Sequence, residues 1–172
     1  TIGAGAVAEG DFALTIGSSG RLCCIAGQPM EDSRLLNLYG AYDGQYIIVQ
    51  STNNACVSLR WFRDTFGSEA ARQAQAAGCG IYPYLDRLAD TAPAGAGGLI
   101  WLPYLAGEQS PVWDTRARGV FYGAGLETDY PSFIRAVLEG VAFSQRHCLE
   151  VVLDRAARPD IIPLGGGAAN SP

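Results

Sequence analysis

A stretch of apolar residues with helical spacing, near the end of the chain, constrains the fold more than any other part of the sequence. Its apolar residues recur at the spacing that gathers them on one helix face: Ile134, Val137, Leu138, Val141, Cys148, Leu149 and Val152. Pro131 behind Asp129 is typical of a first turn, and the repeat predicts a helix to about Arg155, with Pro159 beyond its end. Such a helix must bury its apolar face against another layer.

A strand and a glycine-rich turn are expected after this helix. Residues 160–164 form a short apolar run that leads directly into the Gly-Gly-Gly-Ala sequence at 165–168. A further helix is expected to start at 170–172, where the chain stops. Because the chain also begins without methionine, we expect it to be a piece of a longer protein.

The first 50 residues predict an antiparallel meander. Residues 11–17 and 21–26 are apolar runs on either side of a Gly-Ser-Ser-Gly turn. Residues 35–42 and 45–50 flank Asp43-Gly44, a dipeptide that is typical of tight hairpins.

The middle of the chain predicts three helices and two strands. Asn53 or Asn54 could cap a helix ended by Gly67 in the left-handed conformation, and Ser68 could cap the next, ended by Gly78. The expected helices cover 55–66, 69–77 and 81–89, and the expected strands 98–105 and 119–123. With no internal repeat or linker, this order describes a single mixed α/β domain.

Composition narrows the classes of partner. The net charge is −5, and no run of lysine and arginine occurs, which argues against nucleic acid. A phosphate ligand stays open, because backbone N–H groups can hold it without a basic surface. No apolar run approaches the length of a membrane span, and no signal peptide is visible.

The cysteines predict reduced thiols rather than a disulfide framework. They are odd in number (Cys23, Cys24, Cys56, Cys79 and Cys148), and none forms a CxxC pair. With His147 as the single histidine, a zinc site is not expected either, and His147 is expected on the solvated side of the long helix. We therefore predict a cytoplasmic protein with mostly buried thiols.

A long polar connection separates the two expected strands at 98–105 and 119–123. The segment from Pro103 to Asp114 closes at Ala117-Arg118-Gly119, and long connections in compact domains are usually functional or disordered. Its aromatic and branched residues argue against disorder, and Arg118 is expected to anchor it.

The two glycine-rich turns each allow two interpretations. Gly17 and Gly20 permit close approach of a ligand, and Ser18 and Ser19 offer hydroxyl groups, so this turn could clasp a terminal phosphate. Taken alone, it is more simply an ordinary hairpin turn, and the turn at 165–168 could equally join a strand to a helix. The chain has no Gly-Lys-Ser, which excludes a P-loop.

Taken in order, these motifs resemble the FGGY carbohydrate kinases. That family's C-terminal domain carries a Gly-Thr-Ser-Gly hairpin, a Leu-Arg-Trp-x-Arg-Asp helix, Pro-Tyr-Leu-x-Gly-Glu-Arg-x-Pro, Ala-Arg-Gly, Arg-Ala-x-x-Glu-Gly and Gly-Gly-Gly-Ala. The corresponding residues here are 17–20, 59–64, 103–111, 117–119, 135–140 and 165–168. The resemblance implies a ribonuclease H-like α/β fold of the actin/hexokinase/Hsp70 ATPase superfamily. It also implies that 1–172 are a C-terminal ATP-binding domain, without the N-terminal sugar-binding domain and the extreme C-terminus.

The resemblance also implies an ATP site, with Mg²⁺ bridging the phosphates. Its residues would be Gly17, Ser18 and Ser19 at the β- and γ-phosphates, Gly166, Gly167, Ala168 and Asn170 at the adenosine and α-phosphate, and Cys56 lining the cleft. Ser18 stands where the family has Thr, which keeps the hydroxyl. Gln109 stands where it has Arg, which removes a cation from the central loop. The resemblance implies that the family's catalytic aspartate lies upstream of Thr1, so we expect no catalytic base among these residues.

The implied activity is ATP-dependent phosphorylation of a sugar hydroxyl. The sequences around Trp113 and Trp61 look most like xylulokinases, acting on D-xylulose, with gluconokinases next. The implied partners are a sugar, ATP and an N-terminal domain of the same protein, and a homodimer is compatible with the resemblance. A different class also remains open: a non-catalytic nucleotide-sensing module of the same fold. The kinase interpretation requires Ser18 and Ala168 to face the same side of the molecule.

Overall fold

The computed structural model describes residues 1–171 and contains a five-stranded mixed sheet. The strand order is β3-β4-β2-β1-β7, where β1 is Phe12–Ile16, β2 Gly20–Ala26, β3 Leu36–Tyr39, β4 Tyr46–Thr52 and β7 Leu164–Gly165. All neighbouring pairs are antiparallel except β1 and β7, which are parallel. The antiparallel strands predicted for the first 50 residues are therefore confirmed, but their order is not that of a meander, because β2 pairs with β4 and leaves β3 at the edge. Gly44, in the β3–β4 connection, has a positive φ of 75°.

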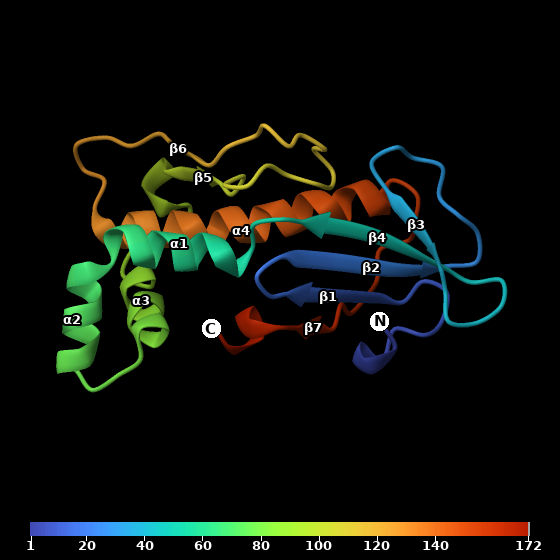
Figure 1. Ribbon diagram of the computed structural model, residues 1–172, viewed down its shortest axis with the longest axis horizontal. Helices are drawn as coiled ribbons and strands as arrows, with labels where there is room; N and C mark the ends of the chain where they lie inside the picture. The colour runs from blue at the N-terminus through green and yellow to red at the C-terminus, as the bar shows by residue number, and fades with distance from the viewer. Residues whose placement is uncertain (172) are drawn as a thin grey trace.

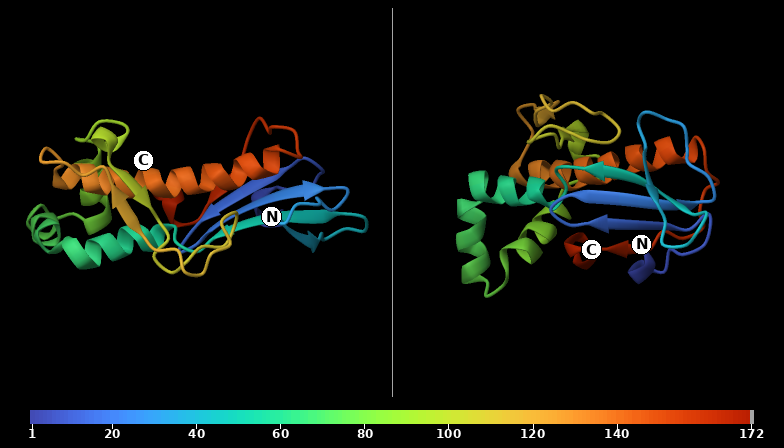
Figure 2. Two further views of the ribbon diagram at one scale, coloured as in Figure 1. Left: turned by 90° about the horizontal axis from the view of Figure 1, so that it is seen from above. Right: turned by 45° about the vertical axis from the view of Figure 1, so that its right-hand side comes forward.

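The helices form two groups. α4, Tyr130–Leu153, lies along one face of the sheet and continues past its end, where α1, α2 and α3 are gathered (Figures 1 and 2). Helix α1 is Cys56–Phe66, α2 is Ser68–Ala76 and α3 is Ile81–Ala89. A second, two-stranded sheet consists of β5, Ile100–Leu102, and β6, Val120–Tyr122. Three short 3₁₀ helices cover Ile2–Ala4, Ala96–Gly98 and Gly167–Asn170, the last of which is called η3.

The long helix α4 joins two hydrophobic cores. Its C-terminal half presents Cys148, Val151 and Val152 to the sheet, where they pack with Phe12 and Ile48. Its N-terminal half packs with α1, α3 and β5. Every one of these named side chains is at most 3% exposed. The apolar side chains of α4 thus hold the sheet and the helical group together.

A close approach of backbones fixes α4 against β5. A Cβ atom on Gly140 would collide with the carbonyl oxygen of Trp101, so a glycine is needed there. The Trp101 ring stacks on Trp61 of α1, with ring centroids 5.4 Å apart and planes 10° apart. Trp101 and Trp61 are packing residues at the centre of the helical group.

The start of α4 matches the prediction, because the Asp129 side chain accepts from the Ser132 N–H at 2.9 Å and Pro131 lies in the first helical turn. Other local predictions were wrong. Gly67 has φ −92°, outside the left-handed region, and neither α1 nor α2 has a side-chain cap. Gly78 does have a positive φ, of 65°.

The predicted strands in the second half are shorter than expected. Only Leu164 and Gly165 pair with β1, although Leu14 also donates its N–H to the Pro163 carbonyl at 2.9 Å. The prolines at 159 and 163 have no N–H to extend the pairing. The helix expected to start at 170–172 involves Pro172, which lies outside the described residues. Within residues 1–171, no helix is both long and apolar enough to cross a lipid bilayer.

Candidate functional site

The turn between β1 and β2, residues 17–20, is held by the start of helix α1. The Cys56 N–H donates to the Gly17 carbonyl at 2.9 Å, and the Ala55 N–H donates to the Ser18 carbonyl at 3.1 Å. The turn also closes on itself, since the Gly17 N–H donates to the Ser19 carbonyl at 2.9 Å. Both serine side chains are exposed. The helix start therefore uses turn carbonyls in place of a side-chain cap.

A buried polar network holds the other end of this turn. The Thr52 hydroxyl accepts from the Gly20 N–H at 3.2 Å and from the Gln145 side-chain amide at 2.8 Å. Thr52 and Gln145 are 2% and 5% exposed. A Cβ on Gly20 would occupy the space of the Gln145 amide group, so a larger residue at this position would displace that amide from Thr52. The turn is thus fixed on both sides while its serines stay open to solvent.

The turn that follows β7, residues 165–170, lies beside the first turn. Because β1 and β7 are parallel, both chains leave the sheet at the same edge (Figure 1). Gly166 has φ 94°, and a Cβ there would collide with the Ile16 carbonyl oxygen. The second turn therefore packs directly against the last residue of β1, next to the first turn, which requires a residue without a side chain at 166.

Cys56 contacts both turns. Its N–H binds Gly17, and its thiol points to the Ile16 carbonyl, with Sγ and the oxygen 3.7 Å apart. Burial raises the pKa of the Cys56 thiol, and a hydrogen bond from the Ala168 backbone partly offsets this effect. Gly17 and Ala168 therefore both lie next to Cys56, whereas no hydrogen bond links Ser18 itself to Ala168 among the described residues.

A cavity of about 750 Å³ opens beside Cys56 and the second turn. It lies among α1, α3, α4 and η3, and its wall is largely apolar. The residues singled out from the sequence that line it are Cys56, Gly167, Ala168 and Asn170. Gly17, Ser18, Ser19 and Gly166 are not part of the wall; Ile16 lines it and places the first turn next to it. A cavity of this size suits a nucleoside-sized ligand.

The rim of the cavity carries polar residues that sequence reasoning did not assign to a site. Tyr82, Asp86 and Asp90 follow one another at four-residue spacing on and just after α3. That spacing could have shown that they share a face, but nothing in it indicates which face meets a cavity. On α4, Arg135 and Glu139 line the same rim and form an ion pair, with 2.6 Å between Nε and Oε1.

The cavity and the β1–β2 turn differ in the charged groups that they present to a ligand. The cavity rim has three carboxylates, on Asp86, Asp90 and Glu139, against the single guanidinium of Arg135. Such a rim suits hydroxyl and amino groups better than phosphates. The β1–β2 turn, by contrast, presents backbone and hydroxyl groups. Among residues 1–171, no three histidine, cysteine or acidic side chains are grouped to hold a metal ion.

The polar connection of residues 103–118, called the central loop below, packs beside the site instead of lining the cavity. Its Glu108 carboxylate accepts from the Asn53 N–H at 2.7 Å, directly before α1. Its Arg118 guanidinium donates to the carbonyls of Thr115 and Ala117 within the same loop. Arg118 is therefore a structural residue, but its hydrogen bonds stabilise the loop internally, and it is Glu108 that attaches the loop to the domain.

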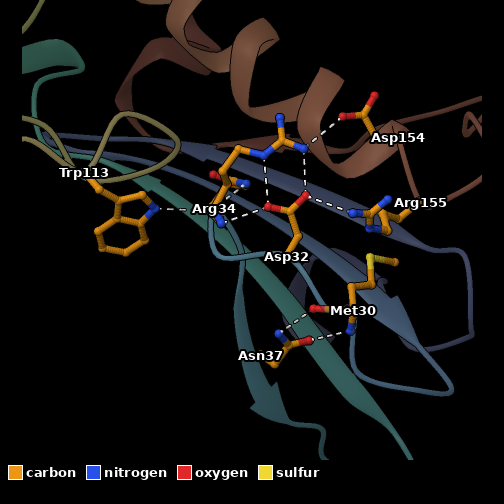
Figure 3. Close-up of polar contacts among 8 residues, drawn as sticks. Met30, Asp32, Arg34, Asn37, Trp113, Asp154 and Arg155 are labelled. Carbon is orange, nitrogen blue, oxygen red and sulfur yellow. Dashed lines mark hydrogen bonds and ion pairs between the residues drawn. The ribbon is translucent and has the colours of Figure 1, made fainter.

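The tip of the central loop rests on a charged cluster beyond the end of α4 (Figure 3). The Trp113 indole N–H donates to the Arg34 carbonyl at 3.3 Å. The Asp32 carboxylate, 7% exposed, pairs with Arg34 at 2.7 Å and with Arg155 at 3.3 Å. Hydrogen bonds from Arg34 hold the pKa of Asp32 well below its usual range. This cluster links the loop, the sheet and the end of α4.

Comparisons with known proteins agree with this arrangement. The model of the C-terminal domain of the FGGY family of carbohydrate kinases matches residues 12–172. A gluconokinase of Bacillus subtilis is 35% identical over 144 residues, covering 83% of this chain and 28% of the relative. A xylulose kinase of the same organism is 29% identical over 174 residues, covering 98% of the chain and 32% of the relative.

Solved structures give the same result. A ligand-bound xylulose kinase and a gluconate kinase, both from Lactobacillus acidophilus, superpose with a TM-score of 0.86 at 33% and 32% identity. Each comparison covers 99% of this chain and 33% of the other. A glycerol kinase of Plasmodium falciparum, with a TM-score of 0.79 and 19% identity, shares the fold. The chain thus spans about a third of the length of these relatives.

Proposed function

Because this chain belongs to the FGGY family of carbohydrate kinases, as its C-terminal domain, we propose that it is the ATP-binding part of an enzyme that phosphorylates a sugar hydroxyl. Its fold is the ribonuclease H-like α/β fold predicted from the sequence. Residues 1–172 would hold the nucleotide, and the rest of the protein would hold most of the sugar and the catalytic aspartate.

The observation that carries the proposal is the contact between the two glycine-rich turns through Cys56. The β1–β2 turn would bind the β- and γ-phosphates through the exposed Ser18 and Ser19 hydroxyls and nearby backbone. Gly167, Ala168 and Asn170, which line the neighbouring cavity, would lie against the adenosine, and that cavity would hold it. The acidic rim favours this orientation, because it repels phosphate and accepts hydrogen bonds from ribose hydroxyls.

The chemistry asked of this domain is positioning and charge stabilisation. Phosphoryl transfer needs little covalent help from the protein, so rigid groups around the triphosphate contribute most. We propose that Mg²⁺ enters with ATP, since this cation keeps several waters and binds largely through phosphate oxygens. When bound, it neutralises charge on the phosphates. The fixed β1–β2 turn would hold the terminal phosphate in line with the sugar hydroxyl.

For the substrate, we propose D-xylulose, phosphorylated to xylulose 5-phosphate, with gluconate as the second candidate. The similarity around Trp61 and Trp113 favours the first. The 35% identity to the Bacillus gluconokinase supports gluconate as the second candidate substrate. We also propose a cytoplasmic enzyme that contains an N-terminal sugar-binding domain and forms a homodimer.

Two measurements on the full-length protein test the proposal. Calorimetry should show ATP binding, and a coupled assay of ADP release should show turnover with D-xylulose or gluconate but not with an unrelated polyol. ATP binding without turnover on any sugar of a broad panel would favour the alternative of a non-catalytic nucleotide-sensing module. No ATP binding at all would overturn the assignment of the two turns.

A further inference from the structure

We propose that Glu108 is a positioning residue for the phosphate groups of ATP, acting through the four residues that join β4 to α1. This inference rests on the proposed function, because it assumes that the β1–β2 turn holds the phosphates. Residues 53–56 are called the β4–α1 junction below. Glu108 lies 2% exposed against this junction and contacts no residue of the cavity wall by hydrogen bond.

The two oxygens of the Glu108 carboxylate have different surroundings. Oε1 accepts from the Asn53 N–H at 2.7 Å and from the Gln109 N–H at 2.8 Å. Oε2 is enclosed and has no hydrogen-bond partner among residues 1–171. Burying Oε2 without a partner is costly, whereas the contact of Oε1 with the Asn53 N–H ties the central loop to the junction.

A second contact reinforces the first one residue later. The Asn54 side chain, 1% exposed, accepts from the Ala106 N–H at 3.2 Å and donates to the Gly107 carbonyl at 2.8 Å. Only an amide side chain offers an acceptor and a donor in this geometry. The junction is therefore gripped twice by the central loop, at 53 and at 54.

The other half of the junction grips the β1–β2 turn. Ala55 and Cys56 donate their N–H groups to the carbonyls of Ser18 and Gly17. Four consecutive residues thus carry the loop contacts at one end and the turn contacts at the other. Moving Asn53 by losing the Glu108 contact would shift the N–H groups that hold the turn.

The contact does not depend on an ion pair. In the family pattern an arginine follows the glutamate, and here that residue is Gln109. Burial raises the pKa of Glu108, and the titratable groups that face it are Tyr104 and Cys148. Oε1 accepts hydrogen bonds whether the group is charged or neutral. A glutamine at 108 would therefore keep both backbone contacts.

The test uses Glu108→Ala, Glu108→Asp and Glu108→Gln in the full-length protein, with calorimetric titration of ATP and of adenosine. In Glu108→Ala we expect about tenfold weaker ATP binding, the size of one lost buried hydrogen bond. Adenosine affinity should fall by a clearly smaller factor, because adenosine would meet the junction only at Ala55 and Cys56 and would not reach the β1–β2 turn. Glu108→Gln should bind both ligands like the unmodified protein, and so should the exposed control Glu127→Ala.

Equal losses for ATP and adenosine would overturn the inference, because they indicate general loosening of the domain. Unchanged ATP affinity in a folded Glu108→Ala protein would overturn it as well. If that variant does not fold, Glu108→Asp decides, since its shorter side chain withdraws the acceptor from Asn53. If the unmodified protein binds ATP no more tightly than adenosine, the proposed function itself is contradicted. That result can be told apart from an effect of residue 108, because it needs no variant.

Discussion

The N–H of Cys56 donates a 2.9 Å hydrogen bond to the carbonyl of Gly17, so helix α1 starts on the turn between β1 and β2. The thiol of the same residue lies between that turn and the turn after β7. Cys56 thus lies next to both halves of the proposed nucleotide site.

Cys56 should therefore react with alkylating reagents in a nucleotide-dependent way. Cys56 and Cys79 are half-buried, whereas Cys24 and Cys148 are enclosed and burial raises their pKa values to about 11 and about 12. We expect slow labelling of Cys56 that saturating ATP suppresses at least about fivefold. Mass spectrometry of digests measures both sites at once. Cys79, which lies outside the cavity wall, is the internal control: equal protection of both would argue against ATP at the site.

Gly167→Asp should weaken ATP binding without unfolding the domain. A Cβ at this position meets nothing within 4 Å, so the fold can accept a side chain there, but the new carboxylate would face the cavity. We expect at least about tenfold weaker ATP binding, because charge repulsion from phosphate adds to the loss of space. Calorimetry checks affinity and thermal unfolding checks stability. Gly125→Asp is the matched control, since its Cβ also meets nothing, and an ATP affinity equal in the two variants would refute the assignment.

Thr52→Val should destabilise the protein by about 1–3 kcal/mol, because the Gly20 N–H and the Gln145 amide would both lose a buried acceptor. Chemical denaturation measures this cost. Thr15→Val, at an exposed position of β1, should change stability by less than about 0.5 kcal/mol. A Thr52 variant as stable as that control would show that the network does not hold the turn.

Asp32 should make stability depend on pH in the acid range. Its folded-state pKa is lowered by Arg34, so its ionised form stabilises the folded protein above the unfolded value near 3.8, and this contribution is lost as pH falls further. Asp32→Asn should therefore be less stable than the unmodified protein at pH 7, with the difference shrinking below about pH 4. Urea denaturation from pH 7 to pH 3 measures it, with the exposed Asp43→Asn as control. A difference that stays constant with pH would contradict the role of the carboxylate charge.

Local patterns predicted the elements around the site well. The spacing from Ile134 to Val152 indicated α4, and Asp43-Gly44 indicated the β3–β4 hairpin, because both signals arise within a few residues of the chain. The caps were the local error. Asn54 has the chemistry of a helix cap, but its side chain binds Ala106 and Gly107 instead. A distant loop outcompeted the neighbouring N–H groups.

The sequence by itself determined which segments are helices, strands and glycine-rich turns, and its motifs indicated the family, because helix periodicity and turn chemistry act over short spans. Only the tertiary structure decided that Gly166 packs on Ile16, that Asp86 and Asp90 border the cavity, and that Glu108 holds Asn53. Those contacts join residues tens of positions apart, and they follow from how the parallel β1–β7 pairing and α4 bring the layers together. No short-range pattern encodes that placement.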